Sequence, residues 1–145
     1  MPSSVETVEY APGRRADLFG DPAQRTVLMW HGTQTDARAS MRPLAERLAE
    51  IGAGVMVTDW NSHAEDRGRA DLLRSLRFAR ESSAAPDGIV LVGWSLGGVA
   101  AAGATIHASR LGVRLRHTVC LAGAFMVADP LTGDPLPADL ADCHD

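Results

Sequence analysis

Short runs of β-favouring apolar residues alternate along the chain with longer segments in which apolar residues recur every three or four positions. The short runs predict strands at 26–30, 54–59, 89–92 and 117–122, and the longer segments predict helices at 41–51, 69–80 and from the end of the third run to about 110. Two further strands, Val5–Tyr10 and Ala16–Phe19, are expected to form a hairpin around Pro12-Gly13. This alternation predicts an α/β fold, a three-layer sandwich around a mostly parallel sheet of about six strands.

Helix boundaries and inward faces also follow from the pattern. Ser40 is the candidate N-cap of the first helix, and Gly52 is its stop. The inward faces are predicted to carry Leu44, Leu48 and Ile51 on the first helix and Leu72, Leu73, Leu76 and Ala79 on the second.

The most informative local pattern is Gly93-Trp94-Ser95-Leu96-Gly97. It follows the apolar run Ile89–Val92 directly and precedes a helix of small residues, so it predicts the strand, sharp turn and helix of a nucleophile elbow. Such a turn lifts the hydroxyl of Ser95 clear of the sheet beside the N-terminus of a helix, where negative charge is stabilised. The alternative interpretation is a serine in a tight turn without chemistry.

A second signal lies where the strand ending at Trp30 runs into His31-Gly32-Thr33. Ligands of parallel α/β sheets bind at the carboxyl ends of the strands. Attack by Ser95 on an ester carbonyl would create an oxyanion that needs two donors in place. One donor would be the N–H of Leu96 and the other the N–H of Thr33 or Gly32. The alternative is an ordinary loop.

Composition removes several other functions. The net charge of −4 argues against a nucleic-acid partner. All 14 basic residues are Arg, so the chain has no Lys to serve a P-loop or to form a Schiff base with pyridoxal phosphate. Cys120 and Cys143 supply neither a disulfide framework nor a metal cluster, and we expect no cofactor and no metal. The chain lacks a bilayer-spanning run and a secretory signal, which predicts a cytoplasmic protein.

Other side chains have two interpretations each. Trp30, Trp60 and Trp94 are expected at strand ends, either as walls of an apolar acyl pocket or as core under the loops, and the core interpretation is favoured for any one of them. His63 and His107 are interpreted as surface or helix-face residues. A dinucleotide-binding domain is excluded because Ser95 stands where that fingerprint needs its second Gly.

The run Thr26–Thr33, about sixty residues before the elbow, together with the intervening strand and helix, resembles the N-terminal core of an α/β-hydrolase-fold carboxylesterase. The resemblance covers roughly Val5 to Ala128 and implies the sheet order 1-2-4-3-5-6 with the hairpin at one edge. It implies Ser95 as the nucleophile and Thr33 and Leu96 as the oxyanion donors. Residues 1–128 would then form the hydrolase core, and 129–145 a loop-like C-terminal segment.

In this family the catalytic acid and histidine follow the nucleophile, on loops after two further strands. The chain departs from that pattern, because its sequence leaves no room for two such strands after residue 122. Asp129 and His144 stand in the right order after Ser95 to supply them, although nothing in the sequence holds His144 rigidly. The alternative is that the chain is the N-terminal part of a longer hydrolase. The function predicted is cleavage of small-molecule carboxylic esters, with a catalytically silent ligand- or partner-binding module as the second hypothesis.

Without a seventh strand, His117–Ala122 would be an exposed apolar edge. Such an edge predicts pairing with a second copy of the chain, giving a homodimer, or aggregation.

Overall fold

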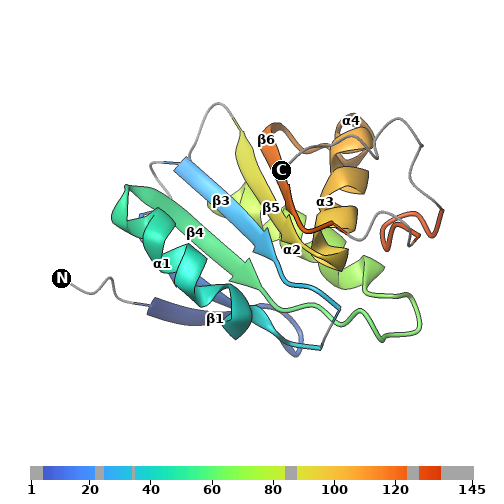
Figure 1. Ribbon diagram of the computed structural model, residues 1–145, viewed down its shortest axis with the longest axis horizontal. Coiled ribbons are helices and arrows are strands. Elements are labelled where there is room, and N and C mark those ends of the chain that lie inside the picture. The colour runs from blue at the N-terminus through green and yellow to red at the C-terminus, as the bar shows by residue number, and fades with distance from the viewer. Residues whose placement is uncertain (1–4, 22–24, 34, 84–87, 124–127, 135–145) are drawn as a thin grey trace.

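The computed structural model describes residues 5–21, 25–33, 35–83, 88–123 and 128–134 (Figure 1). Their backbone forms one six-stranded sheet with helices on both faces. The strands are β1 (Val5–Ala11), β2 (Arg14–Phe19), β3 (Arg25–Trp30), β4 (Ala53–Thr58), β5 (Ile89–Trp94) and β6 (Leu115–Leu121). The helices are η1 (Arg38–Met41, a 3-10 turn), α1 (Arg42–Glu50), α2 (Arg69–Ser82), α3 (Leu96–Ile106) and α4 (Ala108–Leu111).

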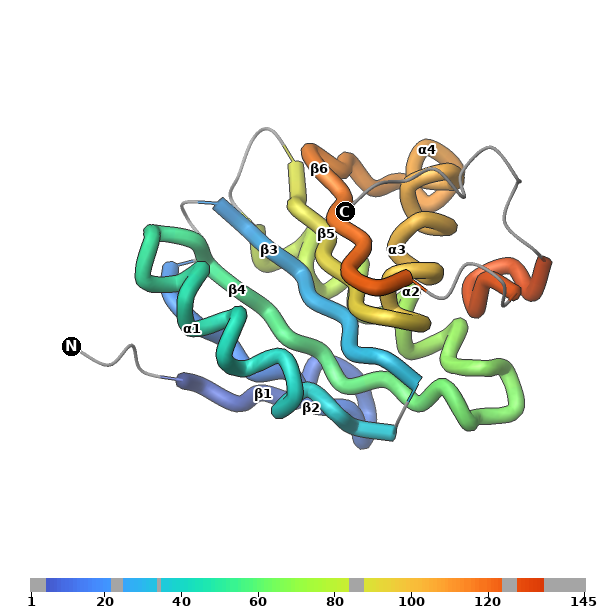
Figure 2. The backbone as a smooth tube through the Cα atoms, in the orientation of Figure 1, coloured from blue at the N-terminus to red at the C-terminus, as the bar shows by residue number. Residues whose placement is uncertain are grey.

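The strand order is β1-β2-β4-β3-β5-β6, which confirms the predicted order and places the hairpin at one edge. β1, β2 and β4 pair antiparallel, and the pairs β4–β3, β3–β5 and β5–β6 are parallel. β3 and β5 therefore lie inside the sheet, with their carboxyl ends at the same edge (Figure 2). Full burial explains why these strands read as continuous apolar runs.

The core consists of two layers, one on each face of the sheet. The layer under α2 and α3 contains Leu28, Leu72, Leu76 and Leu91, and it is closed by small alanines of α3. The layer under α1 contains Phe19, Met29, Val55 and Val57. The predicted three-layer α/β architecture is confirmed.

The predicted start and inward face of the first helix are partly wrong. The N-cap of α1 is Met41, and Ser40 belongs to η1, where its hydroxyl donates to the carbonyl of Ala37. Leu44 and Ile51 are exposed, Ile51 by 80%, because the helix ends at Glu50 and the buried contact is made by Ala45. On α2, Leu72, Leu76 and Ala79 are buried as predicted, and Leu73 is half-buried.

The remaining boundaries differ by a few residues from those predicted. The helix expected to run to 110 is divided at His107 into α3 and α4, and β6 begins two residues earlier than predicted. Residues 129–134 form a turn closed by hydrogen bonds between Asp129 N–H and the carbonyl of Asp134 and between Gly133 N–H and the carbonyl of Asp129. The rest of the predicted C-terminal segment, with Cys143 and His144, lies outside the described residues.

Among the helices that the structure describes, none has the length and apolar character needed to cross a bilayer.

Candidate active site

Ser95 stands at the junction of β5 and α3 with φ +57° and ψ −119°. A side chain in this region of backbone conformation is strained by about 1–3 kcal/mol and persists only where its surroundings enforce it. Here they do so, because the Ser95 N–H donates to the carbonyl of Leu121 on β6, and the Ser95 carbonyl accepts the first bonds of α3 from Gly98 and Val99. The side chain is half-buried and not sealed in the core. The predicted sharp turn is present.

Two glycines make this turn sterically possible. A Cβ on Gly93 would overlap the carbonyl oxygen of Gly97, and a Cβ on Gly97 would overlap the carbonyl oxygens of Trp30 and His31. Both overlaps are with backbone, which cannot move aside as a flexible side chain can. The pattern Gly-x-Ser-x-Gly is therefore a steric requirement of the way α3 begins against β3 and β5.

The loop after β3 approaches Ser95, as an oxyanion site requires. A Cβ placed on Gly32 would lie 3.2 Å from the Cβ of Ser95, so the backbone of Gly32 passes beside the serine side chain. The next residue, Thr33, is exposed. Leu96 is the first residue of α3, and an N–H in that position has no carbonyl one turn earlier to bond. The structure therefore brings the serine, the start of α3 and the Gly32 loop into one corner at the carboxyl edge of the sheet.

His31 holds this loop in place and is not available to Ser95. Its ring lies in the core, with Nδ1 2.8 Å from the carbonyl of Gly32 and Nε2 accepting the Trp60 N–H at 3.1 Å. The indole Nε1–H of Trp60 donates to the His31 carbonyl at 3.1 Å, and the two rings stack with centroids 5.4 Å apart. These bonds place the proton on Nδ1. Burial lowers the pKa of His31, which favours this neutral form.

The three tryptophans divide between the two interpretations. Trp30 and Trp60 are fully buried, so both belong to the core; Trp30 Nε1–H donates to the Ser75 hydroxyl at 2.9 Å. Trp94 is 41% exposed beside Ser95, and its ring lies close to Gly32. Only Trp94 is placed to wall an open site at the serine.

The other predicted acid and histidines do not gather at Ser95. The buried carboxylate of Asp129 accepts the Leu131 N–H at 2.9 Å and the Thr132 hydroxyl at 3.3 Å, and it occupies the space that a side chain at position 103 would need. Position 103 is eight residues along α3 from Ser95, about 12 Å. Burial raises the pKa of Asp129. His144, its candidate partner, falls outside the part of the chain that the structure describes.

The remaining histidines of the described segments are placed elsewhere. His63 is exposed in the loop after β4, His107 separates α3 from α4, and His117 lies on β6 paired with Val90. His117 is near the amino end of its strand, whereas Ser95 lies past the carboxyl end of β5. None of the described imidazoles that remain is thus positioned as a general base for Ser95.

An ionic network at the same edge of the sheet was not predicted. Asp59, 2% exposed after β4, accepts the Arg38 N–H at 3.0 Å and forms an ion pair with the Arg38 guanidinium. The same guanidinium lies 3.0 Å from Asp17 on β2, whose carboxylate also accepts the Thr7 hydroxyl. Tyr10 donates to the carbonyl of Asp59 at 2.5 Å. These bonds tie the N-terminal hairpin to the loops after β3 and β4.

In the described ranges, no three His, Cys, Asp or Glu side chains come together in a group that could hold a metal ion. Cys120 is buried, and its thiol lies 3.3 Å from the carbonyl of Gly98.

Comparison with solved structures identifies the fold. A bacterial heroin esterase superposes with a TM-score of 0.71 at 21% identity over 88% of this chain and 46% of its own. Esterase B from Lactobacillus rhamnosis gives 0.65 at 19% identity over 86% and 50%, and the thioesterase domain from the curacin biosynthetic pathway gives 0.59 at 18% identity over 97% and 51%. The sequence matches no model of a protein family and no curated protein.

These superpositions confirm the α/β-hydrolase fold that the sequence resembles. The chain spans about half the length of the solved structures it matches.

Proposed function

We propose that this chain carries the nucleophile half of a serine hydrolase that cleaves small-molecule carboxylic esters. Ser95 attacks the ester carbonyl and forms an acyl-enzyme with release of the alcohol, and water then releases the acid. The observation that carries the proposal is the strained Ser95 at the β5–α3 corner with the Gly32 backbone beside it. Esterases among the structural neighbours support the reaction class.

The oxyanion that forms during this attack is assigned to the N–H groups of Leu96 and of the loop after Gly32, with Thr33 as the second donor. Each such donor is worth about 3 kcal/mol of transition-state stabilisation in comparable sites. The His31–Trp60 bonds give the loop the rigidity that a preorganised donor requires.

The general base is assigned to a residue outside the described segments, because the four described histidines lie elsewhere or are engaged. His144 is the candidate within this chain. Asp129 is a poor acid partner for it near Ser95, since its carboxylate faces Gly103 and is satisfied within its own turn. A base from a longer protein, of which this chain would be the N-terminal part, is the alternative source.

A fluorophosphonate probe tests the nucleophile. The folded chain should be labelled at Ser95, as identified by peptide mass spectrometry, and Ser95→Ala should lose the label. Ser109→Ala is the matched control because Ser109 is an exposed serine on α4. Absence of label on the folded wild-type chain, and on any longer form of it, would contradict the proposal.

Ester turnover then separates the sources of the base. Loss of p-nitrophenyl butyrate hydrolysis in His144→Ala, with Ser95 still present, would assign the base to this chain. Unchanged hydrolysis would remove His144 from the mechanism.

The second candidate function is a binding module without turnover, favoured by the lack of a described base near Ser95. It predicts that an ester or its acid raises the melting temperature of the chain while no hydrolysis is measurable. Trp94, half exposed beside Ser95, would then be part of the binding surface.

A further inference from the structure

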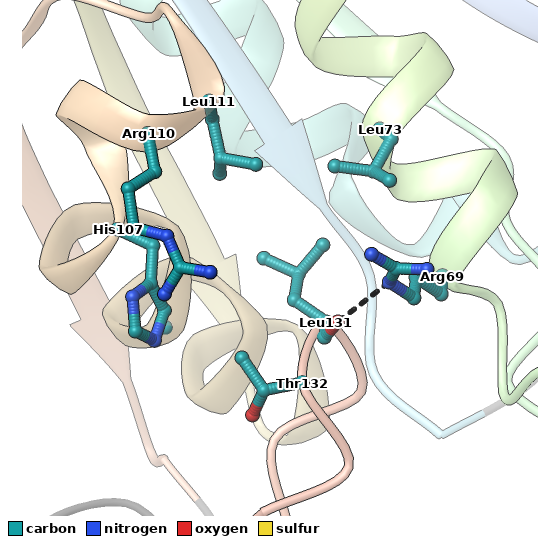
Figure 3. A pocket seen from close by; sticks show the side chains of 8 residues that line it. Arg69, Leu73, His107, Arg110, Leu111, Leu131 and Thr132 are labelled. Atoms are coloured by element: carbon teal, nitrogen blue, oxygen red, sulfur yellow. Dashed lines mark hydrogen bonds between the residues drawn. The ribbon is translucent and has the colours of Figure 1, made fainter.

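A hollow lies between α2, α3, α4 and the 129–134 turn. It encloses about 250 Å³. This volume is room for several waters or for a small organic molecule. Its lining is Arg69, Leu73, Gly103, His107, Arg110, Leu111, Leu131 and Thr132 (Figure 3).

The lining has two chemical parts. Arg110 and His107 stand on one wall and Arg69 on the other, with the side chain of Leu131 between them (Figure 3). Leu73 and Leu111 make the apolar side of the hollow. A site with cations on its rim and leucines behind them is suited to a ligand with a negative head and a short hydrocarbon body.

The two arginines of this hollow make no close ion pair with a described acid. Arg69 does act on Asp66 at longer range, since the pKa of Asp66 is lowered first by its hydrogen bond from the Ala70 N–H and to a smaller extent by the charge of Arg69. Within the described residues, no carboxylate oxygen lies within 4 Å of the guanidinium of Arg69 or Arg110, in contrast to Arg14 and Arg38, which each pair with two acids. Arg69 uses its Nε to donate to the Leu131 carbonyl at 2.9 Å, which leaves its terminal amino groups for a ligand.

Two of the acids near the hollow accept hydrogen bonds from backbone N–H groups. Asp129 is buried beside Gly103 and accepts the Leu131 N–H, and Asp66 accepts the N–H groups of Gly68 and Ala70 at 3.0 and 2.9 Å. Asp134, at the end of the turn, is exposed. Two exposed arginines thus line the hollow, while the one buried carboxylate beside it faces Gly103 and accepts hydrogen bonds from the Leu131 N–H and the Thr132 hydroxyl.

We propose that this hollow binds a small aliphatic carboxylate, with Arg110 and Arg69 holding the carboxylate and Leu73, Leu111 and Leu131 covering the hydrocarbon chain. The site is separate from Ser95, because His107 follows the serine by twelve residues, about 18 Å along α3. It therefore stands whether or not Ser95 is a nucleophile.

Hexanoate binding to the folded chain, followed by isothermal titration calorimetry, tests the proposal. Hexanoate should bind the wild-type chain saturably, and Arg110→Gln should weaken binding by about tenfold or more, since a hydrogen bond to a charged partner is lost. Arg77→Gln is the matched control, because Arg77 is an exposed arginine of α2 that lines a different hollow beside Tyr10. This control should bind as the wild type does, and so should Ser95→Ala.

Ligand variants separate the two parts of the site. 1-Hexanol should bind far more weakly than hexanoate because it lacks the charge, and acetate about tenfold more weakly because it lacks most of the chain. Inorganic phosphate binding as tightly as hexanoate would overturn the apolar half of the assignment. Equal binding to Arg110→Gln and wild type, or no saturable binding up to about 50 mM, would overturn the site itself.

Discussion

At the scale of single residues, the conformation of Ser95 is inseparable from its neighbours. Gly93 and Gly97 leave room for the turn, and Leu121 and Val99 fix its amide and carbonyl by hydrogen bonds. The sequence contained enough information to locate this corner, because glycine spacing and a preceding apolar run are local signals. The backbone strain itself could be measured only in the structure.

The role of His31 could not be predicted from the residues next to it in the sequence. The sequence places a histidine at the mouth of the predicted site, and nothing adjacent in the chain indicates that its ring is used by Trp60, twenty-nine residues later. The pairing depends on β3 and β4 being neighbours in the sheet, which is a tertiary fact. The observed bonds make His31 a positioning residue for the Gly32 loop.

This role predicts a pH dependence of stability. Burial lowers the folded-state pKa of His31, so below about pH 6.5 the unfolded chain takes up a proton that the folded chain does not. The free energy of unfolding should therefore fall as the pH drops below about 6.5, and His31 should contribute at most about 1.4 kcal/mol per pH unit to this fall. Urea unfolding at a series of pH values measures it.

His31→Gln provides the comparison, because it removes this one imidazole and leaves every other side chain of the chain in place. The variant should lose the His31 contribution to the slope below pH 6.5, although it is less stable overall. Equal slopes in the two proteins would show that His31 is not held in its neutral form.

At the scale of elements, the strands were predictable and the helix ends less so. Buried parallel strands carry unbroken apolar runs, so β3, β4 and β5 were found to within a residue or two. The spacing of apolar residues predicts the helix α1 but not which of its faces is buried, because Ala45 and the preceding turn η1 determine how α1 packs on β4. Leu44 and Ile51, which match the period, face solvent instead.

Connections between elements depend on charges that no local pattern reveals. Arg38 sits between Asp17 on β2 and Asp59 after β4, and it reaches both from η1. Arg38→Gln should destabilise the fold by about 3–5 kcal/mol, since it leaves Asp59 buried without its counterion. Chemical denaturation with an intrinsic fluorescence readout measures this loss.

Arg42→Gln is the internal control for that experiment. Arg42 pairs with Glu46 at 2.7 Å, but both side chains are substantially exposed on α1. Its loss should change stability by about 0.5 kcal/mol or less. If both variants lost the same stability, the Arg38 network would be no more than a surface ion pair.

At the scale of the whole molecule, β6 is the edge strand of the described sheet and lies next to β5, the strand that leads to Ser95. Helix α3 packs against β5 and β6, while α1 lies over β4. Among the described residues β6 pairs only with β5. Val119 on β6 and Trp94 on β5 are exposed by 36% and 41%.

This arrangement predicts self-association of the chain along β6. Size-exclusion chromatography with light scattering should show a dimer or a mass that rises with concentration, and Val119→Lys should shift it to monomer, because charge on an edge strand opposes pairing. Ile51→Lys removes an apolar side chain that is more exposed than Val119 and belongs to the end of α1, and it should leave the mass unchanged. A wild-type monomer at high concentration would contradict the prediction.

The approach of Gly32 to the serine has a bearing on how such a chain could change over generations. A Cβ atom on residue 32 would lie only 3.2 Å from the Cβ of Ser95. An alanine there would crowd the serine side chain and the neighbouring Trp94, whose carbonyl oxygen and ring lie 3.4 and 3.5 Å from the same carbon position. If Ser95 is the nucleophile that we propose, one added methyl group at position 32 would be enough for descendants of this chain to lose the reaction while they keep the fold.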